Sequence, residues 1–63
     1  MWIITKDSGI LNTDHFSWIK EDSYGMTLAY SLASDKKTII SIKPVLDKIT
    51  EALINGATFV EVD

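Results

Sequence analysis

The architecture of this chain is indicated most strongly by residues 43–56, which read KPVLDKITEALING. Pro44 suits the first position of a helix because it lacks the N–H group that would have no partner there. Gly56 suits the residue after a helix because it adopts the left-handed conformation without strain. Between them the apolar residues recur at helical spacing, which predicts one amphipathic helix over 44–55. Its apolar stripe consists of Val45, Leu46, Ile49, Ala52 and Leu53.

The rest of the chain is typical of short strands separated by turns. Residues 26–33 alternate with period two, which predicts a half-buried strand whose larger side chains face the core. Other strands are expected over 2–5, 10–12, 16–21, 37–42 and 58–62. The predicted core residues are Ile4, Ile19, Leu28, Tyr30, Leu32, Ile40, Ile42, Leu46, Ile49, Leu53 and Val60.

These elements predict an α+β fold, in which an antiparallel meander of four to five strands is packed by one helix. The last strand is expected to join the sheet at an edge, and a small SH3-like partial barrel with a helix is the alternative. The 63 residues, 1–63, are expected to form a single small globular domain. The chain has no cysteine, so disulfides cannot stabilise it, and we expect a homodimer because association supplements a small core.

The charge of the chain excludes several classes of partner. Six lysines, nine acidic residues and no arginine give a net charge of −3, which provides no basic footprint for nucleic acid. A stacking platform of aromatic rings would need a cationic groove beside it, and the sequence shows none. No apolar run approaches the roughly 20 residues that span a bilayer. We therefore expect no nucleic-acid partner, no membrane interaction and a cytoplasmic location.

The residue types that usually perform catalysis or bind metals are sparse. His15 is the only imidazole, and Asp14, its neighbour in sequence, would point to the opposite face of a strand. Ser17 would share a face with His15, but no third group or oxyanion hole is evident. The carboxylates lack the spacing of a calcium loop, and the isolated glycines do not form a nucleotide-binding motif. The sequence therefore predicts no catalytic residue, no metal and no cofactor.

The chain has more large aromatic rings than a core under one helix absorbs. One helix covers only one face of a sheet, so either the sheet curls or an apolar patch stays open, unless lysine and threonine side chains cover it. We predict a non-enzymatic protein-interaction module that self-associates through the open sheet face or an edge strand. The alternatives are an acidic inhibitor or accessory protein that binds a host protein, and, less favoured, a small enzyme centred on His15. The predicted interface residues are Trp2, Phe16, Trp18 and Phe59.

Both ends of the chain carry short recurring patterns. They are Trp2-Ile3, the GILN of residues 9–12, the helix that ends in Asn55-Gly56, and the FVEV of residues 59–62. In these pieces the chain resembles small uncharacterised proteins of Gram-positive bacteria and their phages. The resemblance implies an α+β fold and a bacterial or phage origin, and it supplies no catalytic residue.

Overall fold

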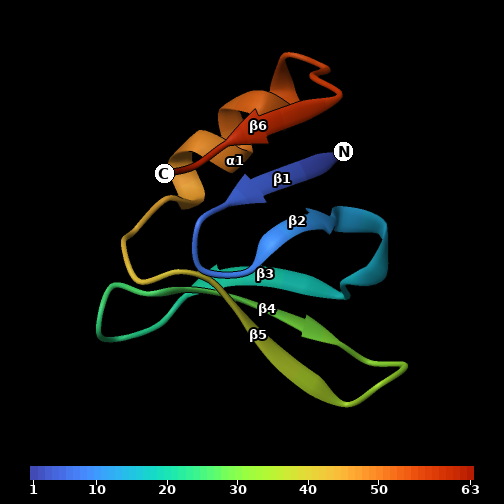
Figure 1. The fold of residues 1–63 in the computed structure, drawn as a ribbon, viewed down its shortest axis with the longest axis vertical. Coiled ribbons are helices and arrows are strands. Elements are labelled where there is room, and N and C mark those ends of the chain that lie inside the picture. The colour runs from blue at the N-terminus through green and yellow to red at the C-terminus, as the bar shows by residue number, and fades with distance from the viewer.

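The computed structural model describes all 63 residues and contains six strands and one α-helix (Figure 1). The α+β class is confirmed. A 3-10 turn over Thr13–His15 separates the second and third strands. The elements in chain order are β1 Trp2–Thr5, β2 Gly9–Asn12, β3 Trp18–Glu21, β4 Thr27–Ser31, β5 Lys36–Ser41, α1 Leu46–Ile54 and β6 Phe59–Glu61.

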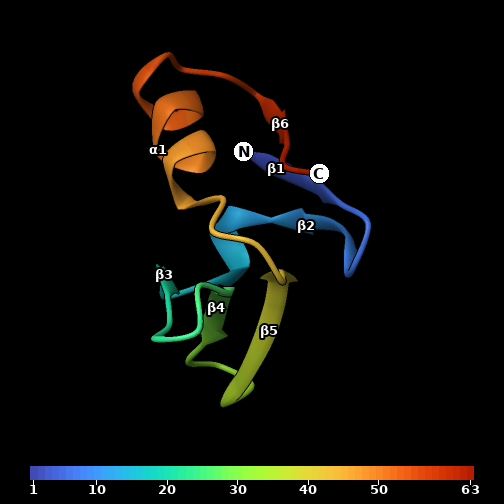
Figure 2. The same cartoon turned by 90° about the vertical axis from the view of Figure 1, so that its left-hand side faces the viewer.

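The strands divide between two three-stranded sheets and do not form one meander. The first sheet has the order β2-β1-β6, and the second sheet has the order β3-β4-β5. β6 pairs parallel to β1, which confirms the expected C-terminal edge strand, and all other pairs are antiparallel. Figure 2 shows the second sheet below the first, with α1 on one side of the first sheet. The break occurs at the 3-10 turn, where the Asn12 side chain accepts a hydrogen bond from the Asp14 N–H at 3.0 Å.

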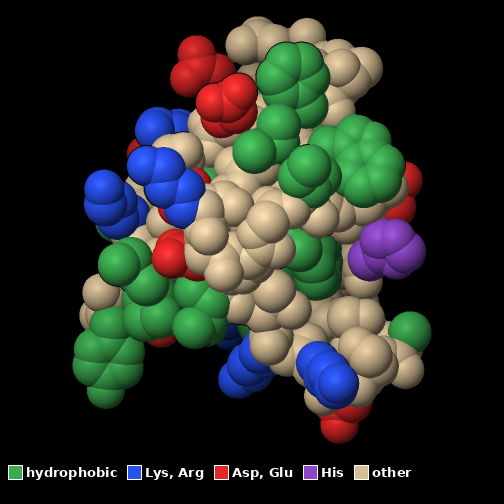
Figure 3. Space-filling view, in the orientation of Figure 1, with side chains coloured by type: hydrophobic (Ala, Val, Ile, Leu, Met, Phe, Trp, Pro, Cys, Tyr) green, Lys and Arg blue, Asp and Glu red, His purple; other side chains and the backbone are tan.

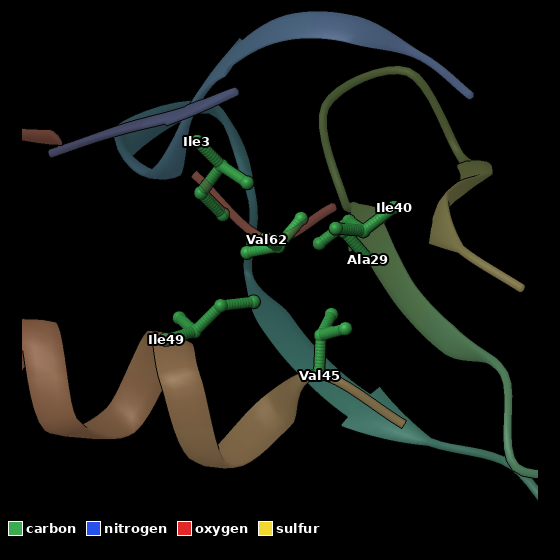
Figure 4. Close-up of a cluster of buried hydrophobic side chains, with 6 residues drawn as sticks. All are labelled: Ile3, Ala29, Ile40, Val45, Ile49 and Val62. Atoms are coloured by element: carbon green, nitrogen blue, oxygen red, sulfur yellow. The ribbon is translucent and has the colours of Figure 1, made fainter. Parts of the chain in front are cut away.

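The core is small and draws on both sheets and the helix. Six apolar side chains are buried, and Figure 4 shows them pointing toward one another. They come from both ends of the chain as well as from its middle, so no single segment forms the core alone. The core residues are Ile3, Ala29, Ile40, Val45, Ile49 and Val62.

The one α-helix of the structure, α1, has nine residues, which is too few to cross a membrane.

The face of β4 that meets the core is the opposite of the predicted one. Thr27 and Ala29 are fully buried, whereas Leu32 lies beyond the strand and is 71% exposed. The hydroxyl of Thr27 donates to the Lys43 carbonyl at 2.9 Å and accepts the Val45 N–H at 3.0 Å. These bonds tie β4 to the segment that leads into α1 and require Thr27 to point inward. A shift of one residue moves every side chain of a strand to the other face.

Two further predicted core residues are exposed. Ile42 lies just beyond the end of β5 and is 63% exposed, and Leu53 is 56% exposed on α1. The helix buries only Ile49 completely, with Leu46 and Ala52 half-buried beside it. The buried stripe of the helix is therefore narrower than the apolar stripe in its sequence.

The buried hydroxyl of Thr27 gives a test of this arrangement. We expect Thr27→Val to lower the free energy of unfolding by about 1–3 kcal/mol, because the Lys43 carbonyl and the Val45 N–H would lose their partner. Thr58→Val is the matched control, since the side chain of Thr58 is exposed. Urea unfolding followed by circular dichroism measures both variants. Equal stability of the two would contradict the role assigned to Thr27.

Candidate functional site

The first sheet has one face that neither the helix nor the second sheet covers. In its register Trp2 lies beside Phe59 of β6, and Ile4 lies beside Ile10 of β2. Trp2 and Ile4 are two apart on β1, so their side chains share one face of the sheet. The four side chains therefore form one contiguous patch, which we call the apolar face: Trp2, Ile4, Ile10 and Phe59.

The apolar face is open to solvent. Trp2 is 49% exposed, Phe59 56% and Ile10 65%, and Ile4 is half-buried. Figure 3 shows hydrophobic side chains gathered over β1 and β6. Glu61 is the only charged residue that the three strands place on this face. Exposed apolar clusters of this kind typically mark sites of contact with another protein.

The opposite face of the first sheet explains why this one stays open. Ile3 is fully buried on that side and packs in the same cluster as Ile49 of α1. Leu11 and Val60, which pair with Ile3 on either side, are half-buried against this cluster. The single helix therefore covers the inner face of the sheet and leaves the outer face without a covering layer.

The structure brings together two of the four predicted interface rings. Trp2 and Phe59 are direct neighbours on the apolar face. Phe16 is half-buried and packs against the core, and Trp18 lies on the second sheet. Ile4, which the sequence places in the core, lies on the apolar face instead.

The two aromatic residues of the second sheet, Trp18 and Tyr30, make their contacts within the molecule. The rings of Trp18 and Tyr30 stack with their centroids 5.3 Å apart and an interplanar angle of 15°. The Lys20 ammonium lies 4.7 Å from the centroid of the Trp18 ring, within the range of a cation–π interaction. The Tyr30 hydroxyl donates to the Asp35 carboxylate at 2.6 Å. On this face of the second sheet, the two rings are therefore in contact with other side chains of the same sheet.

His15 is exposed at the end of the 3-10 turn. The Ser17 hydroxyl, which the sequence places on the same face as His15, accepts the Leu32 N–H at 3.2 Å. No group of three or more histidine or carboxylate side chains is placed to hold a metal ion.

Ile4 and Ile10 are the members of the apolar face that the sequence analysis does not identify. The alternation of residues along a strand shows which side chains share a face of that strand, but it does not show how the faces of different strands are combined in a sheet. The pairing of β1 with β2 and β6 then places these side chains on the same face of the sheet.

No family model, curated protein or solved structure matches this chain, so a function must be inferred from this geometry.

The pair formed by Tyr30 and Asp35 has a measurable consequence. The hydrogen bond to the Asp35 carboxylate, together with partial burial, raises the pKa of Tyr30 above 10.0. A pKa that is raised by folding means that the protonated phenol stabilises the fold below pH 10 and that this contribution is lost as the pH rises through the folded-state pKa.

We expect Asp35→Asn to lower the pKa of Tyr30, because the phenolate would no longer face a carboxylate. Phenolate absorbance in a Tyr24→Phe background isolates the titration of Tyr30, and Asp47→Asn provides a control with the same charge change. An unchanged titration curve in Asp35→Asn would show that the hydrogen bond is not formed in solution.

Proposed function

We propose that this chain is a non-enzymatic interaction module that forms a homodimer through the apolar face of its first sheet. The supporting observation is the contiguous patch of Trp2, Ile4, Ile10 and Phe59, three of which are about half exposed or more. Large aromatic side chains at the centre of an interface supply most of its binding energy. Trp2 and Phe59 are the two aromatic residues of this proposed interface.

The chemistry of the face favours a second copy of the same chain. An isologous interface places the same patch on both sides of a two-fold axis, so the patch must be compatible with itself. With Glu61 as its only charged strand residue, the apolar face lacks a charge pattern that would select a partner of opposite sign. Two such faces in contact bury apolar groups against apolar groups.

The size of the core provides a second reason for association. Only nine of the 63 residues are buried, and six of these are apolar. Chains of this length without disulfides or metals commonly gain stability from oligomerisation. Burial of the apolar face in a dimer adds to the hydrophobic free energy that the monomer lacks.

The area of the face sets the expected strength of the dimer. The chain exposes 4275 Å² in all, and a standard interface would bury about 800 Å² of each partner. Three strands of three or four residues cover less than this. Interfaces below the standard size are typical of weak, reversible complexes, so we expect a dissociation constant on the order of 10 μM.

Substitution of Ile10 tests the proposal. We expect Ile10→Lys to weaken the dimer by about tenfold or more, because an ammonium group would be buried against apolar side chains. Ile54→Lys is the matched control, since Ile54 is 79% exposed on α1 and lies outside the apolar face. Sedimentation velocity over a range of protein concentrations measures both variants. Association that is equally strong in both would exclude this face as the interface.

Trp2 offers an independent spectroscopic measurement. In a Trp18→Phe variant the fluorescence comes from Trp2 alone. We expect its emission to shift to shorter wavelength as the protein concentration rises, because the indole moves from water into the dimer interface. The same variant with Ile10→Lys should keep the emission of an exposed indole. A spectrum that does not change with concentration, in a chain that sediments as a monomer, would rule out the proposed dimer.

A further inference from the structure

The only charged strand residue on the outer side of the first sheet is Glu61. It pairs with Ile4 across β6 and β1, and it lies two residues from Phe59 on the same strand. Alternate residues of a strand share a face, so the Glu61 side chain is adjacent to two members of the apolar face. It is exposed in the single chain, where water solvates its charge. The surface that we propose to be buried in the dimer therefore has a carboxylate at its margin.

The charged groups near Glu61 come from the two elements that pack against β6 and from the residues that follow it. On the β1 side, Lys6 follows the strand, and its N–H donates to the Asp63 carboxylate at 2.8 Å. On the α1 side, the Lys48 ammonium donates to a backbone carbonyl just after β6 at 3.4 Å, and Glu51 lies one turn further along the same helix. Figure 2 shows that α1 lies on the inner side of the sheet. Lys6 is therefore the base whose influence on Glu61 has to be tested.

Two-fold symmetry decides what Glu61 meets when two apolar faces come together. For two identical faces in contact the axis lies in the plane between them, and in aligned packing it runs along the strands or across them. An axis along β1 exchanges the edge strands β2 and β6, which puts Glu61 opposite Ile10 of the second copy. An axis across the strands exchanges the two rows of side chains, which puts Glu61 opposite Phe59 of the second copy. In both arrangements the carboxylate meets an apolar side chain and not a cation.

We propose that formation of the dimer is pH-sensitive, because each chain takes up a proton at Glu61 as the two apolar faces come together. This inference rests on the proposed dimer. An ionised carboxylate that loses its water without gaining a partner is costly, whereas the neutral acid is tolerated far better. The dimer then binds protons more strongly than the separate chains, so association strengthens as the pH falls. Free glutamate side chains titrate at about pH 4.3, so the change develops as the pH falls from neutral toward that value.

Sedimentation velocity of the full chain at neutral and mildly acidic pH tests this linkage. We expect the dissociation constant of the wild-type dimer to fall about tenfold between about pH 7 and about pH 5. Glu61→Gln carries no charge at that position at either pH. It should associate about tenfold more tightly than the wild type at neutral pH and show little dependence on pH. Circular dichroism at each pH checks that the fold is intact.

Glu51→Gln is the matched control, since it makes the same change in net charge but lies on α1 at the other side of the sheet. It should keep the pH dependence of the wild type. Equal dissociation constants for Glu61→Gln and the wild type at neutral pH, or the same pH dependence in both, would overturn the proposal and leave the dimer itself in place. Absence of association in Glu61→Gln at every pH would instead reject the dimer and, with it, this inference.

Lys6 provides the test of the opposite outcome. A lysine that paired with Glu61 in the dimer would favour the ionised carboxylate, and association would then weaken as the pH falls. We expect Lys6→Gln to leave the dissociation constant at neutral pH within about twofold of the wild-type value. Weakening of the dimer by both Lys6→Gln and Glu61→Gln, together with weaker association in acid, would show such a pair and overturn the proposal.

Discussion

Hydrogen bonds from side chains to backbone groups join the two sheets, since no strand ladder runs between them. The hydroxyl of Thr5, at the end of β1, donates to the Ile40 carbonyl of β5. The Asp7 carboxylate then accepts the Ile42 N–H at 3.3 Å, and Thr27 holds the segment before α1. These contacts place β1 over the end of β5 and direct the chain into the helix.

The two sheets deal with their uncovered faces in different ways. On the second sheet the rings of Trp18 and Tyr30 stack on one another and Lys20 lies over the indole, and Ile39 on the same face is 42% exposed. On the first sheet Trp2 and Phe59 are adjacent but have no covering residue of this kind, and both are about half exposed. The sequence leaves open both coverage by long polar side chains and an open apolar patch. The structure shows a lysine over an indole on the second sheet and an open patch on the first.

Local sequence signals predict the helix well, because Pro44 and Gly56 bound a periodic segment and α1 is found over Leu46–Ile54. They also predict the α+β class and the edge position of the last strand. They do not predict the orientation of β4, because the apolar alternation competes with the inward hydrogen bonds of Thr27. Nor do they reveal the apolar face, which requires β1 to pair with a strand from the other end of the chain.

The position of β6 links the proposed interface to folding. Its pairing with β1 closes a loop of almost the whole chain, which costs conformational entropy, and the strand itself is only three residues long. Phe59 reaches Trp2 only when β6 is docked, so a partner that binds the apolar face also stabilises the docked strand.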